Sequence, residues 1–461
     1  MKKFILIFHV SLFTFHLSAQ TVTQKLQKAF TAFEKDSQLK HAISSIYIID
    51  ANTGKVVFDK NSQIGLAPAS TQKIITSVTA FELLGKDYRY KTEFGRCVDP
   101  EKSICFWVAP SGDPTFGSWR WESTKEKNVL DKLIAAIKKI NDVKNLRSIV
   151  LNATGWNAEQ IPDGWIWQDI GNYYGAGAGI LNWRENQYDL IMKSGDKIGE
   201  NVTIVGTVPA LYSYNIHSQV ISAEKGSGDN SYIYLPSDGV NAIVRGTIPV
   251  REDRFRISGS IVNPANQFIN TLKDSLRNII NWPADPLSIT YGPLFQTPTI
   301  FYTHYSPALD SIVYWFNKKS INLYGEALLK TFAYEKNGFG STDSGVVIVK
   351  KFWKEKGMDE NEINIVDGSG LSPLNRVTTR AQVEILKYAK TKDWFPYFFT
   401  SLPEYNGMKI KSGTIRGVKG FCGYHKAKNS KEYIFSFLVN NYNGSSSALV
   451  NKMYKVLDLL K

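Results

Sequence analysis

Residues 68–73 read Pro68-Ala69-Ser70-Thr71-Gln72-Lys73, and an apolar run with helical spacing follows them as far as Leu84. Residues three apart on a helix share a face, so the Ser70 hydroxyl and the Lys73 amine can meet there. Ser70 would also serve as an N-cap, but a capping box has Glu or Gln three residues on, and Lys73 opposes the helix dipole. The spacing therefore indicates a serine nucleophile beside a lysine base, although the same spacing also recurs by chance in long chains.

A lysine acts as a base near neutral pH only if its pKa falls from about 10.4 towards 7 or 8. Burial and a second nearby cation both lower it. The candidate cation is in Lys411-Ser412-Gly413-Thr414, within the alternating segment Met408 to Ile415, which predicts a strand. Gly413 would let a substrate backbone approach closely, while Lys411 and Ser412 would offer a cation and a hydroxyl to a carboxylate. A solvated edge strand explains this short segment equally well.

The third candidate is Ser320-Ile321-Asn322, at the start of a predicted helix. Ser320 alone would be interpreted as an N-cap. A hydroxyl and an amide two residues apart at a helix start can instead point into one cleft. In the order S-x-x-K, S-x-N, K-S-G, the three segments match the signature of the penicillin-recognising serine enzymes.

A fourth segment makes the resemblance specific. Asp367-Gly368-Ser369-Gly370-Leu371-Ser372, followed by Asn375-Arg376-Val377-Thr378, resembles the DGSGLS-xx-NRVT stretch of the class C low-molecular-mass penicillin-binding proteins, the D-alanyl-D-alanine carboxypeptidase/endopeptidase family. The resemblance runs from about residue 25 to the C-terminus and is weakest between 200 and 290. Ser412 stands where that family more usually has threonine, and Gly325 where it more often has alanine, a change expected to matter little.

The resemblance implies an acyl-enzyme mechanism. Ser70 would attack the carbonyl between two D-alanines, and Lys73 would take its proton. Ser320 would relay a proton to the leaving amine, and Asn322 would hold Lys73 and the substrate backbone. A β-lactam would follow the first half of this reaction and stall, so peptidoglycan stem peptides and β-lactams are the expected ligands, with no cofactor.

The resemblance also assigns the strand at 411–414. Lys411 would keep Lys73 neutral and attract the terminal carboxylate, which Ser412 and Thr414 would hydrogen-bond. The oxyanion hole would be the backbone N–H groups of Ser70 and Thr414, where losing one donor typically costs about 10²- to 10³-fold in rate.

Asp169 is a further candidate for substrate binding. It follows Trp165-Ile166-Trp167-Gln168 and precedes Tyr173-Tyr174-Gly175-Ala176-Gly177. Its carboxylate would face the free ammonium of a stem-peptide side chain. An aspartate satisfied within its own loop, beside core tryptophans, is an equally good interpretation.

The secondary-structure pattern changes along the chain. A helix over Thr21 to Phe33 and a hairpin over Ala42 to Asp59 are predicted first. From about Arg89 short β-like runs alternate with turns that contain Gly and Pro, and one helix, Val129 to Ile140, interrupts them. Helices return from Tyr305, and strands and a last helix end the chain.

With 461 residues the chain is too long for one ordinary core. We therefore predict an α/β (α+β) fold of the penicillin-binding transpeptidase/β-lactamase-like type. Residues 20–88 and 294–461 would form the serine peptidase domain. Residues 89–293 would be an inserted β-rich region, either one unit or two small domains.

The first residues have the pattern of a secretory signal. Two lysines precede an apolar run from Phe4 to Leu17, and Leu17-Ser18-Ala19 resembles a cleavage site. The run is too short to cross roughly 30 Å of hydrocarbon comfortably. We expect removal of residues 1–19 and export to the periplasm or cell envelope. No cysteine lies near the cleavage point, so a lipoprotein is not expected.

The chain has three cysteines. In an oxidising compartment Cys97 and Cys105 would close a hairpin around the turn Asp99-Pro100-Glu101-Lys102, which leaves Cys422 single. No HExxH or CxxC spacing occurs, so metal catalysis finds no support in the sequence.

The formal charge is +13. In an exported protein such a surface would attract anionic envelope polymers or lipid headgroups, and a merely solvated basic surface is the plainer interpretation. Nucleic acid is not an expected partner, because the lysines are spread along the chain without a recognition motif.

Three other functions fit the sequence less well. A β-lactamase would use the same three motifs, but no region is assignable to the loop that carries its extra glutamate, and the long insertion does not suit that compact fold. A non-enzymatic wall-binding protein would have lost reactive groups that are all retained here. A hydrolase of the GxSxG type lacks its pentapeptide. The sequence leaves carboxypeptidase and endopeptidase activity, and the identity of the third stem residue, open.

Overall fold

The computed structural model describes residues 20–98, 104–140, 146–212, 214–235, 241–277, 288–291 and 297–461. The expected signal segment, 1–19, and the expected turn at 99–102 lie outside these residues. Among the described helices none is both long and apolar enough to cross a membrane.

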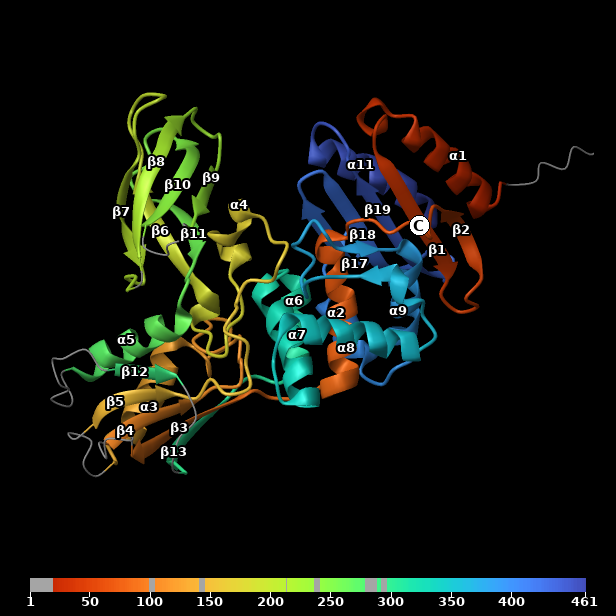
Figure 1. Ribbon diagram of the computed structural model, residues 1–461. Helices are drawn as coiled ribbons and strands as arrows, with labels where there is room; N and C mark the ends of the chain where they lie inside the picture. Colours follow the sequence, from red (N-terminus) through yellow and green to blue (C-terminus); the bar gives the residue numbers. More distant parts are fainter. Residues whose placement is uncertain are drawn as a thin grey trace, which may run out of the picture.

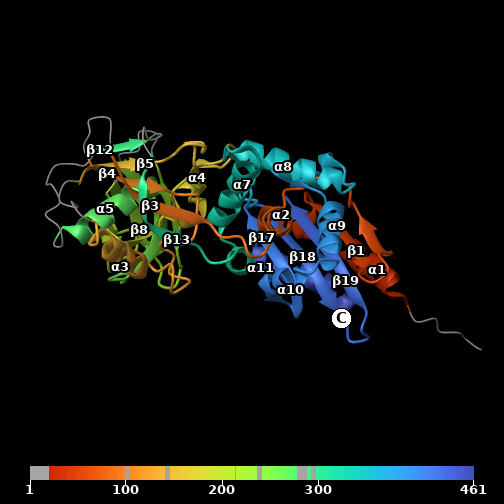
Figure 2. The same ribbon diagram turned by 90° about the horizontal axis from the view of Figure 1, so that it is seen from below.

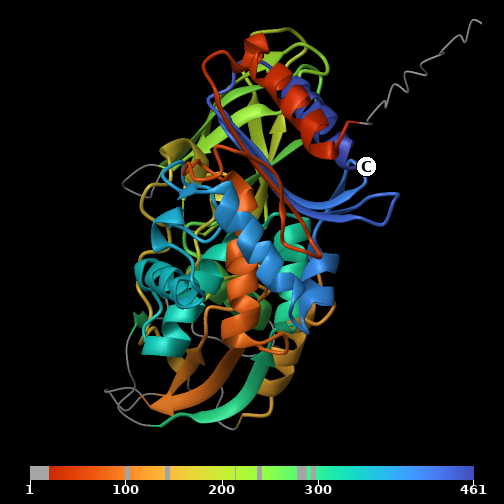
Figure 3. The ribbon, with the colours of Figure 1, turned by 90° about the vertical axis from the view of Figure 1, so that its right-hand side faces the viewer.

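The two ends of the chain meet in one antiparallel sheet. β1 (Ile43–Asp50) pairs with β19 (Glu432–Asn440) over its whole length. Six consecutive residues of β1 are buried, because helices cover both faces of this sheet (Figure 3). The strand order is β16 (Glu404–Tyr405), β17 (Met408–Ile415), β18 (Val418–Lys426), β19, β1 and β2 (Val56–Lys60).

One face of the sheet packs against α1 (Val22–Glu34) and α11 (Ser446–Leu457). A capping box between Thr21 and Gln24 starts α1, and Leu26 and Phe30 carry its apolar face into the sheet. The other face packs against a layer of helices, in which α2 and α7 carry residues of the first and second motifs (Figure 1). This layer contains α2 (Lys73–Leu84), α6 (Leu309–Lys318), α7 (Asn322–Asn337), α8 (Thr342–Glu355), α9 (Thr379–Lys390) and α10 (Phe395–Ser401).

Helix α2 is surrounded by this layer. Every residue from Lys73 to Phe81 is buried, and α2 contacts α6, α7, α8 and α9. A helix that is apolar almost all round belongs inside a core rather than at a surface. Lys73 is the charged residue at its first position, so the fold itself places a lysine amine out of water.

The inserted region forms two units beside this domain (Figures 1 and 2). The first is a five-stranded sheet packed on α3 (Glu126–Ile137) and α5 (Pro264–Leu276). Its strand order is β12 (Ser288–Tyr291), β5 (Leu146–Leu151), β4 (Ile104–Ala109), β3 (Lys91–Val98) and β13 (Thr299–Tyr305).

The second unit contains two three-stranded sheets that share one core around Leu190, Val220 and Val244. The first sheet has the order β11 (Phe255–Ser260), β6 (Gln187–Lys193), β7 (Thr203–Val208), and the second has the order β8 (Asn215–Ala223), β10 (Asn241–Pro249), β9 (Asn230–Tyr234).

Two details differ from the sequence expectations. β13 pairs with β3 of the inserted region and not with the six-stranded sheet of the peptidase domain. The insertion therefore extends beyond residue 293 to Tyr305. α5 was not predicted, although Asn263 caps it, Pro264 opens it, and its buried face has helical spacing. Its short apolar face was hidden among β-like runs on both sides.

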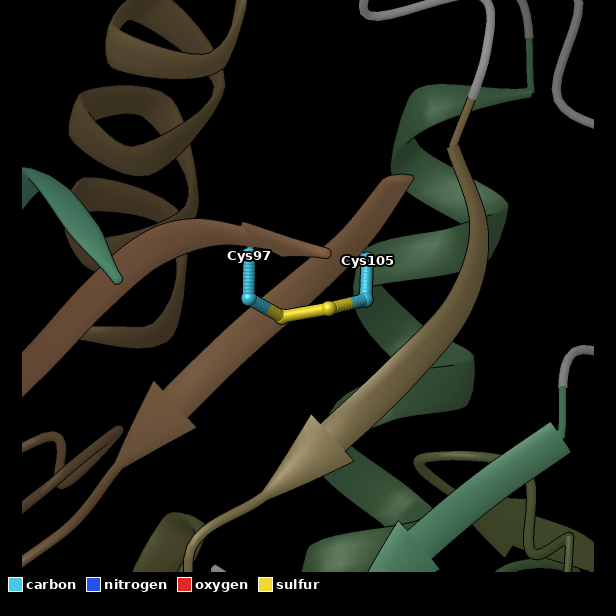
Figure 4. Close-up of a disulfide and its surroundings, with 2 residues drawn as sticks. All are labelled: Cys97 and Cys105. Carbon is cyan, nitrogen blue, oxygen red and sulfur yellow. A yellow bond between two sulfur atoms is a disulfide. The ribbon is translucent and has the colours of Figure 1, made fainter. Parts of the chain in front are cut away.

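Cys97 and Cys105 form a disulfide between β3 and β4 (Figure 4). They are directly opposed in the strand register, and their Cα atoms are 4.9 Å apart. This separation lies within the range that a disulfide spans. Cys422 is a free, buried thiol on β18.

We predict that reducing the Cys97–Cys105 bond lowers the free energy of unfolding by about 2 kcal/mol, because the bond restricts the unfolded chain. Denaturant titrations with and without reductant measure this change. A Cys97→Ser/Cys105→Ser variant is the control and should not respond to reductant. Peptide mapping that finds both thiols free in protein kept under oxidising conditions would contradict the pairing.

Candidate active site

Ser70 lies in a tight turn that packs closely against β17. The turn is a 3₁₀ helix, Ala69–Gln72, and α2 begins only at Lys73, so Ser70 precedes the α-helix in which the sequence had placed it. Ala69 has a left-handed backbone (φ 46°), which is unusual for a residue with a side chain. A Cβ atom on Gly413 would lie 2.9 Å from the Ser70 backbone nitrogen, so only glycine lets β17 come this close.

The Lys73 amine is the centre of the site. Its side chain is fully buried, and Nζ lies 3.0 Å from Ser70 Oγ. Nζ also lies 2.6 Å from Asn322 Oδ1 and 2.7 Å from the Ser369 carbonyl oxygen. The structure thus brings together Ser70, Lys73 and Asn322, as their motifs predicted.

Two effects lower the pKa of Lys73 well below its ordinary value. Burial is the larger, and the positive charge of Lys411 is the second. The carboxylates of Asp367 and Glu326 act in the opposite direction. The net effect weakens the hold of the amine on its proton, and the neutral amine is the form that can accept the Ser70 proton.

Lys411 and Ser320 form a second pair. Lys411 Nζ donates to Ser320 Oγ at 2.9 Å and to the Ser412 carbonyl oxygen at 3.0 Å. Burial lowers the pKa of Lys411 to about 7. Ser320 has a left-handed backbone (φ 58°) and lies before the α7 N-cap, which is Ile321. Its hydroxyl therefore faces Lys411 instead of capping the helix.

Asn322 joins the site to the inserted region. Its Oδ1 accepts from Lys73, and its Nδ2 donates to the Tyr174 carbonyl oxygen at 2.7 Å. The two contacts fix the orientation of the amide, because one end needs a donor and the other an acceptor. No pattern in the sequence indicates that the Tyr174 backbone contacts Asn322.

The DGSGLS segment is held by a buried carboxylate, Asp367, to which the sequence analysis assigned no role of its own. Asp367 is fully buried and accepts from Gln72 Nε2 at 3.0 Å and from Trp165 Nε1 at 3.0 Å. The backbone N–H groups of Gly370 and Ser372 also donate to it, at 2.8 and 2.7 Å. These bonds fix the Ser369 carbonyl against Lys73.

A second buried carboxyl group, Glu326, supports the same segment. Its Oε2 accepts from the Gly368 N–H at 2.9 Å, and burial, with Asp367 nearby, raises its pKa to about 8. Glu326 is four residues after Asn322, on the same face of α7, which is the signal that would have found it. A Cβ atom on Gly325 would lie 2.9 Å from the Gly368 backbone, so this glycine matters more than the sequence suggested.

The site opens into a cleft of about 1230 Å³ between the sheet domain and the inserted region. Asp169, on α4 (Trp167–Ile170), lines it together with Ser70, Asn322 and Thr414. Tyr174 Oη donates to Asp169 Oδ1 at 3.3 Å, and burial raises the pKa of Asp169. The structure therefore places Asp169 at the cleft and leaves it without a cationic partner among the described residues.

The remaining residues of the third motif lie along β17. Ser412 and Thr414 share one face of the strand, since side chains two apart point the same way. Lys419 Nζ donates to Thr414 Oγ1 at 2.7 Å. Within the described residues, no group of His, Cys, Asp or Glu side chains is arranged to hold a metal ion.

We predict that Lys411→Met moves the acid limb of the acylation rate to higher pH. Removing this positive charge raises the pKa of Lys73, so a higher pH is needed to obtain the neutral base. The pH dependence of penicillin acylation measures the shift. Lys411→Arg keeps the charge and should leave the limb at or below its original pH. An acid limb that stays in place in Lys411→Met would show that this charge does not tune Lys73.

Comparison with known proteins agrees with this geometry. Residues 26–407 match the D-Ala-D-Ala carboxypeptidase 3 (S13) family. A D-alanyl-D-alanine carboxypeptidase of Actinomadura sp. is 24% identical over 466 residues, covering 92% of this chain and 83% of that protein.

Solved structures share the fold. Penicillin binding protein 4 (dacB) of Haemophilus influenzae superposes with a TM-score of 0.77 at 19% identity, covering 95% of this chain and 99% of that one. Its complex with a β-lactam gives 0.72 at 18% identity, covering 94% and 98%. The predicted α/β fold with its inserted region is thereby confirmed. As its motifs predicted, the chain belongs to the D-Ala-D-Ala carboxypeptidase 3 (S13) family.

Proposed function

We propose that the protein is a serine DD-peptidase that cuts D-alanyl bonds in peptidoglycan stem peptides through an acyl-enzyme on Ser70. The observation that carries this proposal is the contact of the buried Lys73 amine with Ser70 Oγ at 3.0 Å. A hydroxyl in reach of a neutral amine is an activated nucleophile.

In the first half of the reaction, Ser70 Oγ attacks the carbonyl carbon between two D-alanines, and its proton passes to Lys73 Nζ. The C–N bond then breaks, and the Ser320 hydroxyl relays the proton from Lys73 to the leaving amine, so that Ser320 and Lys73 both regain their starting protonation. Ser320 is placed for this by Lys411, which donates to its oxygen at 2.9 Å. Water attacks the resulting ester in the second half and frees Ser70.

The strand β17 supplies the other contacts. The N–H groups of Ser70 and Thr414 form the oxyanion hole, supported by the close approach of Gly413 to the Ser70 nitrogen. The terminal carboxylate of the substrate binds to Lys411 and to the hydroxyls of Ser412 and Thr414. A β-lactam presents a carbonyl and a carboxylate in the same relation, and the complex of the Haemophilus protein with a β-lactam supports acylation here.

The residues at the start of the chain and the disulfide support export. Residues 1–19 have the composition of a signal segment, and the Cys97–Cys105 disulfide suits an oxidising compartment. We assign the mature protein to the periplasm or cell envelope, where its net charge, +13 for the full chain less the two lysines of residues 1–19, favours contact with anionic polymers.

We predict that Ser70→Ala abolishes covalent labelling by penicillin and lowers peptide cleavage by several orders of magnitude. The measurement is product analysis of the mature protein with a stem pentapeptide ending in D-Ala-D-Ala and with a cross-linked muropeptide dimer. Serine-dependent release of D-alanine or splitting of the dimer supports the proposal. Labelling that survives in Ser70→Ala would remove Ser70 as the nucleophile.

Asp169 gives a second prediction about substrate choice. Its carboxylate lines the cleft and would pair with a free ammonium on the stem peptide. Asp169→Asn should lower kcat/KM about tenfold for a substrate with a free side-chain amine. The same peptide with an acetylated amine is the control. For this peptide Asp169→Asn and the unmodified protein should have equal kcat/KM. Equal losses on both peptides would mean that Asp169 only shapes its loop.

A further inference from the structure

A second preformed group lines the same cleft and has no part in the mechanism above. Arg120 borders the cleft together with Ser70 and Lys319. Its Nε and Nη2 donate to Glu185 Oε1 and Oε2 at 2.7 and 3.0 Å. Glu185 is fully buried, and Ser118 Oγ and Tyr324 Oη also donate to it, at 2.6 and 2.7 Å. The guanidinium is therefore held rigidly in place.

The backbone at Glu185 is strained. Arg184, Glu185 and Asn186 have φ values of 56°, 53° and 51°, which place all three in the left-handed region. Residues with side chains visit this region rarely and usually singly. Such strain persists where the surrounding structure enforces it, and it is common at functional sites. The strained turn directs the Glu185 carboxylate towards Arg120.

Two tryptophan rings also contact the Arg120 guanidinium and help to hold it in place. Its guanidinium carbon lies 5.4 Å from the ring centre of Trp119 and 5.2 Å from that of Trp315. Arg120 binds Glu185 through Nε and Nη2. Its remaining N–H groups, on Nη1 and Nη2, form a second pair of donors whose spacing matches the two oxygens of a carboxylate. Glu185 is the one carboxylate paired with Arg120 among the described residues. A carboxylate in the cleft can therefore bind the second pair of donors.

Lys319 directly follows the last residue of α6, the helix that carries Trp315. Its backbone N–H donates to the Trp315 carbonyl oxygen at 2.9 Å, so the Trp315 ring that Arg120 stacks on is one turn away. The Lys319 side chain is exposed and pairs with no carboxylate in the described part of the chain. Lys319 directly precedes Ser320, the proposed proton donor to the leaving amine, whereas Tyr174 adjoins Asn322. Lys319 thus lies next to the residue that meets the leaving group, and Arg120 borders the same cleft.

We propose that Arg120 and Lys319 form a subsite for a carboxylate on the peptide that leaves the enzyme. This inference rests on the proposed function and names its substrate class. Free D-alanine has one carboxylate, which Lys411 and Ser412 already bind, so it does not reach the subsite. A cross-linked peptide does, because its leaving half carries further carboxylates. The geometry therefore favours cleavage of cross-links over release of terminal D-alanine.

The test compares kcat/KM for a cross-linked muropeptide dimer with kcat/KM for a stem pentapeptide. Two changes are made in the full mature protein: Lys319→Glu, and Arg120→Gln combined with Glu185→Gln, which leaves no buried unpaired charge. The ratio of dimer to pentapeptide cleavage should fall about tenfold in each, the value for losing one hydrogen bond to a charged group. Amidating the carboxylates of the leaving half, except the one next to the scissile bond that Lys411 binds, should lower the ratio similarly for the unmodified protein.

Lys336→Glu is the matched control, because Lys336 is an exposed lysine near the far end of α7 and should leave the ratio unchanged. If the double variant fails to fold, the ratio measured for Lys319→Glu, a change at an exposed side chain, tests the subsite by itself. An unchanged ratio in Lys319→Glu, equal losses on both substrates, or a dimer that the unmodified protein cannot cut would overturn the subsite. An unmodified protein that cuts neither substrate and is not acylated by penicillin would overturn the proposed function, and the subsite with it.

Discussion

The burial of the Lys73 amine is the constraint on which the rest of the site depends. Removing an ammonium ion from water is so costly that the group tends to lose its proton instead. The fold makes this unavoidable, since α2 is enclosed by other helices and Lys73 is its first residue. The carbonyl of Ser369 and the amide oxygen of Asn322 then replace water around the amine. A pKa well below the ordinary value of a lysine follows from packing.

Helix α7 carries this site and also binds the inserted region (Figure 2). Asn322 contacts Lys73 and Tyr174, Tyr324 donates to Glu185, and Lys330 donates to the Ala178 carbonyl oxygen at 2.9 Å. Each of these side chains is buried, so the hydrogen bonds that tie the region to α7 form out of contact with water. The inserted region is therefore a wall of the active site as well as an addition to the fold.

Reactive residues that lie within short motifs could be predicted from the sequence. The contacts that hold them, between residues far apart in the chain, could not. Ser70 and Lys73 are three residues apart, and Lys411 lies in an alternating strand, so short patterns reveal both. Asp367 receives hydrogen bonds from Gln72 and Trp165, which are far from it in the chain, and no local pattern pairs them. The extent of the insertion was misjudged for the same reason, because the pairing of β13 with β3 joins segments some 200 residues apart.

Lys411 acts on both partners of the reaction, and this links substrate binding to the strength of the base. In the free enzyme its positive charge lowers the pKa of Lys73. In the proposed complex the substrate carboxylate lies beside Lys411 and offsets that charge. The pKa of Lys73 then rises towards its ordinary value, so the amine holds a proton more strongly once substrate is bound. Lys411 thereby couples the binding of the substrate carboxylate to the affinity of Lys73 for the proton of Ser70.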